Sequence, residues 1–83
     1  ASYPSGKIVK LTFTGATTEQ PVISQIIKEF DLVVNIVHGK ISNTTGGSFG
    51  TLFIHIDGDQ EQVTEALNFL TKQAIQTEVI EHD

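Results

Sequence analysis

The chain has 83 residues, ten acidic residues, five basic residues that are all lysine, and no cysteine, which gives a formal net charge of −5. This length predicts one small domain, and the absence of cysteine excludes disulfides, thiolate metal sites and thiol nucleophiles. The acidic balance and the lack of arginine argue against a nucleic-acid partner and against docking on anionic lipid. No apolar run approaches the ~20 residues that a membrane-spanning helix needs.

The chain contains no methionine, not even at position 1, so we expect that it was cut from a longer protein or processed. Residues 1–6 (ASYPSG) have the composition of a linker remnant. The domain itself is expected over residues 7–83.

The first part of the chain changes from alternating to helical spacing of its apolar residues. Residues 7–14 (KIVKLTFT) predict a half-buried strand. A helix is expected next, with Thr17 or Thr18 as its cap and Pro21 in its first turn. Its apolar residues repeat along one stripe, and we expect the helix to end at Asp31.

A second strand is predicted over residues 32–42 (LVVNIVHGKIS), and it is apolar on both faces. Strict alternation places Val34 and Ile36 on one face. The opposite face is expected to hold Val33, Asn35, Val37 and Ile41. Gly46 and Gly47 then supply the positive φ angles of a turn.

The rest of the chain predicts a returning strand, a helix and a last strand. Residues 49–57 (FGTLFIHID) complete a hairpin. Asp59 is expected to cap the second helix, in which Phe69 lies off the apolar stripe. Residues 76–82 (QTEVIEH) predict a short final strand.

The order strand–helix–strand–strand–helix–strand predicts an α+β fold of the ferredoxin-like βαββαβ class. Right-handed crossovers place both helices on one face of a four-stranded antiparallel sheet. The other face then carries Phe49 and Phe53 without a helix to cover them. An exposed apolar patch of this kind is typical of a partner or ligand surface, so we expect a second copy or another domain to cover it.

The sequence gives little support for catalysis, metal binding or RNA binding. The sequence has no nucleophile elbow and no phosphate loop in the right context. His38 and His55 are on neighbouring strands, but two ligands do not make a metal site, and we expect neither a metal nor a cofactor. The segment SFGTLFI resembles the aromatic strand of RNA-recognition motifs but lacks a basic residue before it and a second stacking aromatic.

Asn35 is the most informative polar residue, because it stands in the middle of the apolar run VVNIVHG. A buried amide without a hydrogen-bond partner costs ~1–3 kcal/mol. Two interpretations follow from the residues alone. The amide either satisfies a backbone group at a bulge or strand edge, or contacts a small zwitterion whose side chain packs on the apolar neighbours.

The chain resembles the NIL domain family, which is named for an Asn-Ile-Leu tripeptide. The resemblance runs from Lys7 to Glu81. The residues that carry it are Asn35-Ile36-Val37, Gly39, Ile41, Phe49-Gly50, Leu52 and Gly58-Asp59. The third residue of the tripeptide is Val37 where the family has leucine, a difference of one methylene group.

The resemblance implies an ACT-like variant of the ferredoxin-like fold and a non-catalytic role. NIL domains are C-terminal regulatory domains of the ATP-binding subunit of methionine-import ABC transporters, at the cytoplasmic face of the membrane. The implied partners are methionine, a second copy of the domain and, through the parent subunit, the transporter permease. The family places methionine near the interface of two copies, where it inhibits import. The ligand-binding residues expected from these patterns are Asn35, Ile36, Val37, Phe49, Gly50 and Phe53.

Two alternatives remain beside this reading. The first is a purely structural dimerisation module without a ligand. The second is a small enzyme or metal-handling domain on the same fold.

Overall fold

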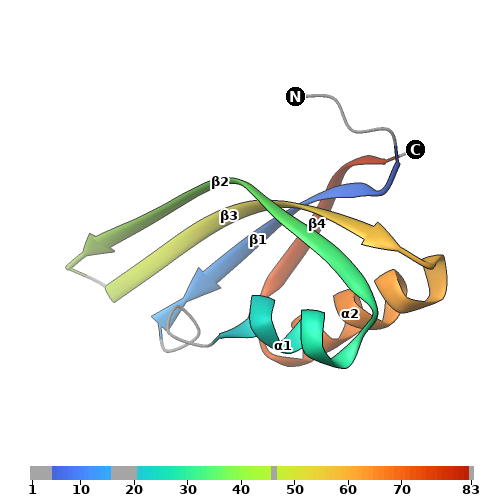
Figure 1. The fold of residues 1–83 in the computed structure, drawn as a ribbon. Coiled ribbons are helices and arrows are strands. Elements are labelled where there is room, and N and C mark those ends of the chain that lie inside the picture. Colours follow the sequence, from blue (N-terminus) through green and yellow to red (C-terminus); the bar gives the residue numbers. More distant parts are fainter. Residues whose placement is uncertain (1–4, 16–20, 46, 83) are drawn as a thin grey trace.

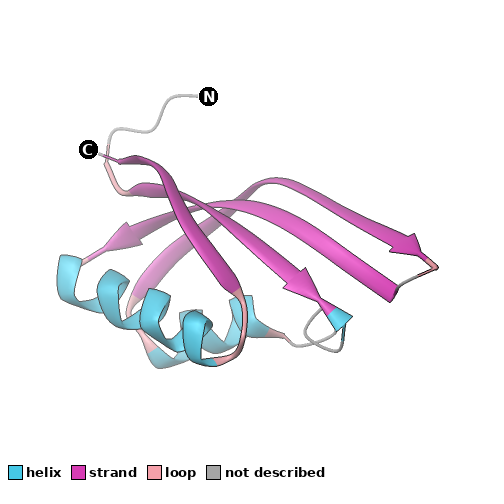
Figure 2. Ribbon diagram, turned by 180° about the vertical axis from the view of Figure 1, so that it is seen from behind, coloured by secondary structure: helices cyan, strands magenta, loops and turns pink. Residues whose placement is uncertain are grey.

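The computed structural model describes residues 5–15, 21–45 and 47–82. It has the predicted βαββαβ order. The elements are β1 (Lys7–Thr14), α1 (Val22–Glu29), β2 (Leu32–Thr44), β3 (Gly47–Gly58), α2 (Gln60–Lys72) and β4 (Gln76–His82). The four strands form one antiparallel sheet in the order β2-β3-β1-β4. Both helices lie on one face of it (Figure 1, Figure 2), so the ferredoxin-like α+β class is confirmed.

The hydrophobic core lies between the helices and the sheet. Alternation along β1 and β3 turns every second residue toward the helices, and these side chains are buried. The α2 stripe and α1 cover them. The core consists of Val9, Leu11, Phe13, Val22, Ile26, Leu32, Ile54, Ile56, Val63, Ala66, Leu70 and Ile75.

The helix starts differ in detail from the sequence-based expectation. Pro21 occupies the N-cap position of α1 rather than its first turn, and it makes no side-chain capping bond. Thr17 and Thr18 lie outside the described residues. Asp59 is the N-cap residue of α2, as predicted, although its side chain makes no capping bond.

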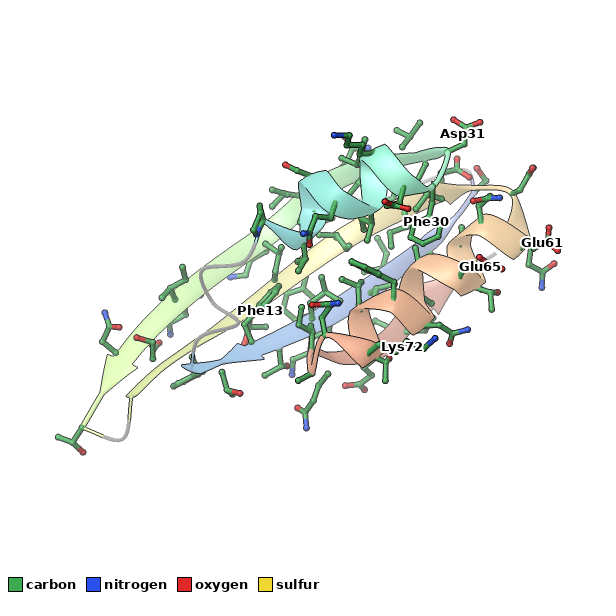
Figure 3. All side chains as sticks on the ribbon, turned by 90° about the horizontal axis from the view of Figure 1, so that it is seen from below. Phe13, Phe30, Asp31, Glu61, Glu65 and Lys72 are labelled. Carbon is green, nitrogen blue, oxygen red and sulfur yellow. The ribbon has the colours of Figure 1, made fainter. Side chains whose placement is uncertain are left out.

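Phe69 lies off the apolar stripe of α2 and still contributes to packing. Its ring meets that of Phe30 at the end of α1 edge to face, with 6.1 Å between the centroids. Both residues are partly buried against the core. An aromatic pair therefore joins the two helices (Phe30 is labelled in Figure 3).

A β-bulge in β2 overturns one expectation about faces. Ile36 pairs with Ile54 and His38 pairs with Phe53, which leaves Val37 as the extra residue. Every residue after Val37 therefore lies on the face opposite to that given by strict alternation. The prediction that Ile41 shares a face with Asn35 is wrong, because Ile41 pairs with Gly50 on the helix side.

Ser5 and Gly6, which directly precede β1, cover one end of the helix-free face. The Ser5 carbonyl is 2.5 Å from His55 Nε2, and the Ser5 hydroxyl donates to Asp57 Oδ2 at 2.7 Å. Gly6 has φ +91, and a Cβ there would stand 2.4 Å from the Ile56 carbonyl oxygen. These contacts explain why His55, on the face without helices, is only 5% exposed.

Candidate ligand-binding site

The six residues predicted to bind a ligand lie on both faces of the β2–β3 hairpin. Asn35, Phe49 and Phe53 lie on the helix-free face, as the register with β1 and β3 requires. Ile36 and Gly50 lie on the helix side, and Val37 is the bulged residue. The structure therefore does not gather them into one constellation within a single chain.

Asn35 is exposed in the middle of the edge strand β2, opposite His55. An exposed amide is hydrated, so the cost of a buried amide does not arise in the single chain. The case of a buried Asn35, considered from the sequence, does not apply to the single chain, because Asn35 lies on the helix-free face of an edge strand.

Phe53 is the centre of the helix-free face. Its ring lies 6.2 Å from that of His38 across the β2–β3 pair. On the other side, Lys10 Nζ lies 6.0 Å from the ring centroid. Phe53 is half-buried and Phe49, nearer the hairpin tip, is exposed. This part of the face therefore mixes aromatic, imidazole and ammonium groups rather than forming an apolar pocket.

A cleft of about 490 Å³ lies on the opposite, helix side of the hairpin. Its volume falls within the ~300–1,000 Å³ range of small-ligand sites. The first turn of α1 forms one wall, and the far parts of β2 and β3 form the floor; Phe13 of β1 closes one end. The lining residues are Phe13, Pro21, Val22, Ile23, Ser24, Gly39, Lys40, Ile41, Gly50, Thr51 and Leu52.

The N-terminus of α1 gives this apolar cleft a polar end. The first backbone N–H groups of a helix have no partner within the helix and carry partial positive charge. Here Pro21 provides no side-chain cap, and no acidic residue stands in the first turn. Apolar walls beside such donors suit a small molecule with an anionic head and an apolar tail.

The outer edge of β2 borders both the cleft and the helix-free face. Its exposed apolar side chains include Val33 (65% exposed), Ile36 (63%) and Ile41 (67%). Ile27 of α1 is a further exposed apolar side chain, at 45%. A long apolar edge strand of this kind is a template for pairing with another chain.

Of the predicted site residues, the structure places only Gly50 in the cleft. Sequence reasoning missed the walls contributed by α1 and Phe13. The signal that could have found the cleft was the pair of glycines inside predicted strands, at positions 39 and 50. A glycine within a strand often marks close approach of a ligand or another backbone.

Neither a metal centre nor a membrane span is found in the part of the chain that the structure describes. No group of three or more histidine or acidic side chains gathers there in a way that could hold a metal ion. No described helix has the length and apolar character needed to cross a bilayer.

Comparison with known proteins gives one consistent family. The NIL domain family matches residues 7–79. The methionine import ATP-binding protein MetN of Bacillus subtilis is 50% identical over 76 residues, which cover 92% of this chain and 22% of that protein. The corresponding protein of Geobacillus kaustophilus is 44% identical over 81 residues, 98% of this chain and 23% of that protein. The chain thus spans less than a quarter of these relatives.

A solved structure shows the same fold in a related chain. It is the C-terminal domain of an ABC transporter ATP-binding protein from Enterococcus faecalis, with a TM-score of 0.82 and 38% sequence identity. The match covers 98% of this chain and 90% of that one. The likeness therefore extends over the whole domain, hairpin included.

Proposed function

This chain belongs to the NIL domain family, and we propose that it is the regulatory domain of a methionine-import ABC transporter ATPase subunit. In this proposal it binds methionine beside an interface with a second copy of itself, and bound methionine inhibits import. The fragment itself is non-catalytic. The parent subunit hydrolyses ATP, contacts the permease and lies at the cytoplasmic face of the membrane.

The observation that carries the proposal is the cleft between α1 and the hairpin. The names of the relatives suggest methionine as the ligand. The apolar walls of the cleft and the helix N–H groups at its end suit this amino acid. The methionine carboxylate would lie at the first turn of α1, where backbone N–H groups replace the absent arginine. Its thioether would lie against Phe13 and Leu52, since contact between sulfur and an aromatic ring is favourable by ~0.3–1.5 kcal/mol.

The exposed edge of β2 supports the second copy. Pairing along this edge would cover Val33 and Ile36, and it would give hydrogen-bond partners to the outward-facing backbone groups of an edge strand. Gly39 and Ile41 belong to the same strand and line the cleft. A second copy on β2 would therefore stand at the rim of the methionine site.

This arrangement provides a physical route to regulation. A ligand shifts an equilibrium between two states only by its difference in affinity for them. A cleft whose rim is completed by a second copy binds more tightly in the paired state. Coupling energies of ~1–3 kcal/mol are typical of such systems, and they would give a 5- to 150-fold response.

Calorimetric titration of the chain with L-methionine tests the proposal. We expect saturable binding of about one ligand per chain, with weaker binding of D-methionine and L-leucine. A folded chain that gives no heat with any of the three would refute a methionine sensor. It would favour the structural dimerisation module, which the β2 edge supports independently.

The direct contact of Asn35 with methionine stays a prediction. Asn35→Ala removes one exposed amide on the helix-free face, so folding should be unaffected. If the amide reaches methionine through the paired interface, affinity falls about tenfold or more, as expected for loss of a hydrogen bond to a charged group. If the affinity for methionine is unchanged, methionine binds in the cleft without contacting Asn35.

A further inference from the structure

The seven glycines of the chain fall into two groups according to backbone geometry. Gly6, Gly15 and Gly47 have φ angles between +59 and +122, which L side chains rarely adopt. Gly58 leaves no room for a side chain, because a Cβ there would stand 3.0 Å from the Asp31 carbonyl oxygen. Local geometry thus accounts for these four, and Gly46 lies outside the described residues.

Gly39 and Gly50 differ from the others. Neither has a positive φ angle, and both lie inside strands. A glycine in a strand interior weakens the strand, because it has no side chain to pack and loses more backbone freedom on folding. Backbone geometry gives no reason to keep glycine at either position.

Both glycines line the cleft, and they alternate with two large residues. Gly39 pairs with Leu52, and Ile41 pairs with Gly50. These four residues form a small patch on the helix side in which each glycine faces a large apolar residue across the strands. A Cβ on Gly39 would come within 3.0 Å of Leu52 Cδ1, and one on Gly50 within 3.4 Å of Ile41 Cγ1. The cleft floor therefore owes its depth to two missing side chains.

We propose that Gly39 and Gly50 are specificity-determining residues of the cleft, leaving the space in which an unbranched apolar amino-acid side chain lies against Leu52 and Ile41. This inference rests on the proposed methionine site and deepens it. Chains with alanine at either position would have a shallower floor. Such a cleft would have no room for the end of the ligand side chain, although the charged head of the ligand would still bind at α1.

The substitution Gly39→Ala tests this inference, with calorimetric titration of L-methionine as the readout. The added methyl displaces only the flexible end of Leu52, and alanine restricts the unfolded chain more than glycine does. The urea unfolding midpoint should therefore stay the same or rise. The dissociation constant for L-methionine should rise by about tenfold or more, the scale set by one methylene in an apolar pocket.

Two further variants separate loss of space from other effects. Gly39→Ala combined with Leu52→Val removes Leu52 Cδ1, the described atom that the new methyl meets, and it should recover part of the lost affinity. Gly15→Ala is the matched control, because a Cβ there meets nothing within 4 Å among the residues that the structure describes. It should leave the methionine affinity unchanged, whatever it does to stability.

The outcomes distinguish this inference about the two glycines from the proposed methionine site on which it rests. If the unsubstituted chain binds L-methionine and Gly39→Ala and Gly50→Ala bind it equally well, the glycine inference is overturned and the sensor stands. If affinity and stability fall together in both variants, the glycines are structural, and the inference also fails. If the unsubstituted chain binds no methionine, the proposed function fails and takes this inference with it.

Discussion

Single backbone positions show where this small domain carries strain. Ala74, directly after the C-cap of α2, has φ +64, the only described non-glycine residue with a positive φ. Its N–H bonds to the Thr71 carbonyl, and the next N–H, of Ile75, bonds to the Leu70 carbonyl. This pattern ends a helix in the left-handed conformation, and glycine is the usual residue there.

Ala74→Gly should stabilise the chain by about 0.5–1 kcal/mol. The strain energy that is relieved exceeds the free-energy cost of the extra backbone entropy that glycine loses on folding. The unfolding midpoint in urea measures this change. Ala66→Gly in the same helix is the matched control and should destabilise the chain by about 1 kcal/mol or more, since Ala66 is buried and helical. Equal losses in both variants would contradict the assignment of strain to Ala74.

Gly6 holds the segment before β1 against the sheet. Gly6→Ala forces a methyl to within 2.4 Å of the Ile56 carbonyl oxygen and 2.7 Å of His55 Nε2, so the segment must move away. We expect destabilisation of about 1–3 kcal/mol and faster hydrogen exchange at residues 5–7. Gly15→Ala shares the positive φ, but its methyl meets no described atom within 4 Å, so it should cost less. A smaller loss of stability in Gly6→Ala than in Gly15→Ala would show that the contact of Gly6 with Ile56 and His55 does not contribute to stability.

At the scale of whole elements, the two helices are joined by the pair Phe30–Phe69. A double-mutant cycle with Phe30→Ala and Phe69→Ala should give a coupling energy of about 0.5–1.5 kcal/mol, measured from denaturant unfolding of the four variants. A coupling within error of zero would mean that each ring packs only on the sheet.

The elements also show what the sequence can and cannot predict. The bounds of β1 agree with the predicted strand at 7–14, because clear alternation and Gly15 define it, and β4 covers 76–82 as predicted. The bulge at Val37 could not be foreseen, since β2 is apolar on both faces and an extra residue leaves the binary pattern unchanged. The cleft was missed for a related reason. It depends on that reversal of faces and on where α1 packs, neither of which is local in sequence.

At the scale of the whole molecule, a lysine on one edge of the sheet is expected to affect dimer formation and a lysine on the other edge is not. Ile36→Lys places a charge on the β2 edge, where the second copy is proposed, and should convert a dimer to a monomer without unfolding it. Ile80→Lys makes the same change on β4, the opposite edge, where Ile80 is 50% exposed. This control should leave the dimer intact. Light scattering after size-exclusion chromatography gives the mass of each, and a dimer lost only in the Ile80 variant would place the interface on β4.

Regulation in this proposal requires that methionine binding and pairing of two copies are coupled. Sedimentation equilibrium of the unsubstituted chain, with and without saturating L-methionine, measures this coupling directly. We expect L-methionine to lower the dimer dissociation constant by about 5- to 150-fold, and D-methionine to lower it less. The same dissociation constant with and without L-methionine would contradict it, because a ligand that does not distinguish the two states cannot regulate the transporter through them.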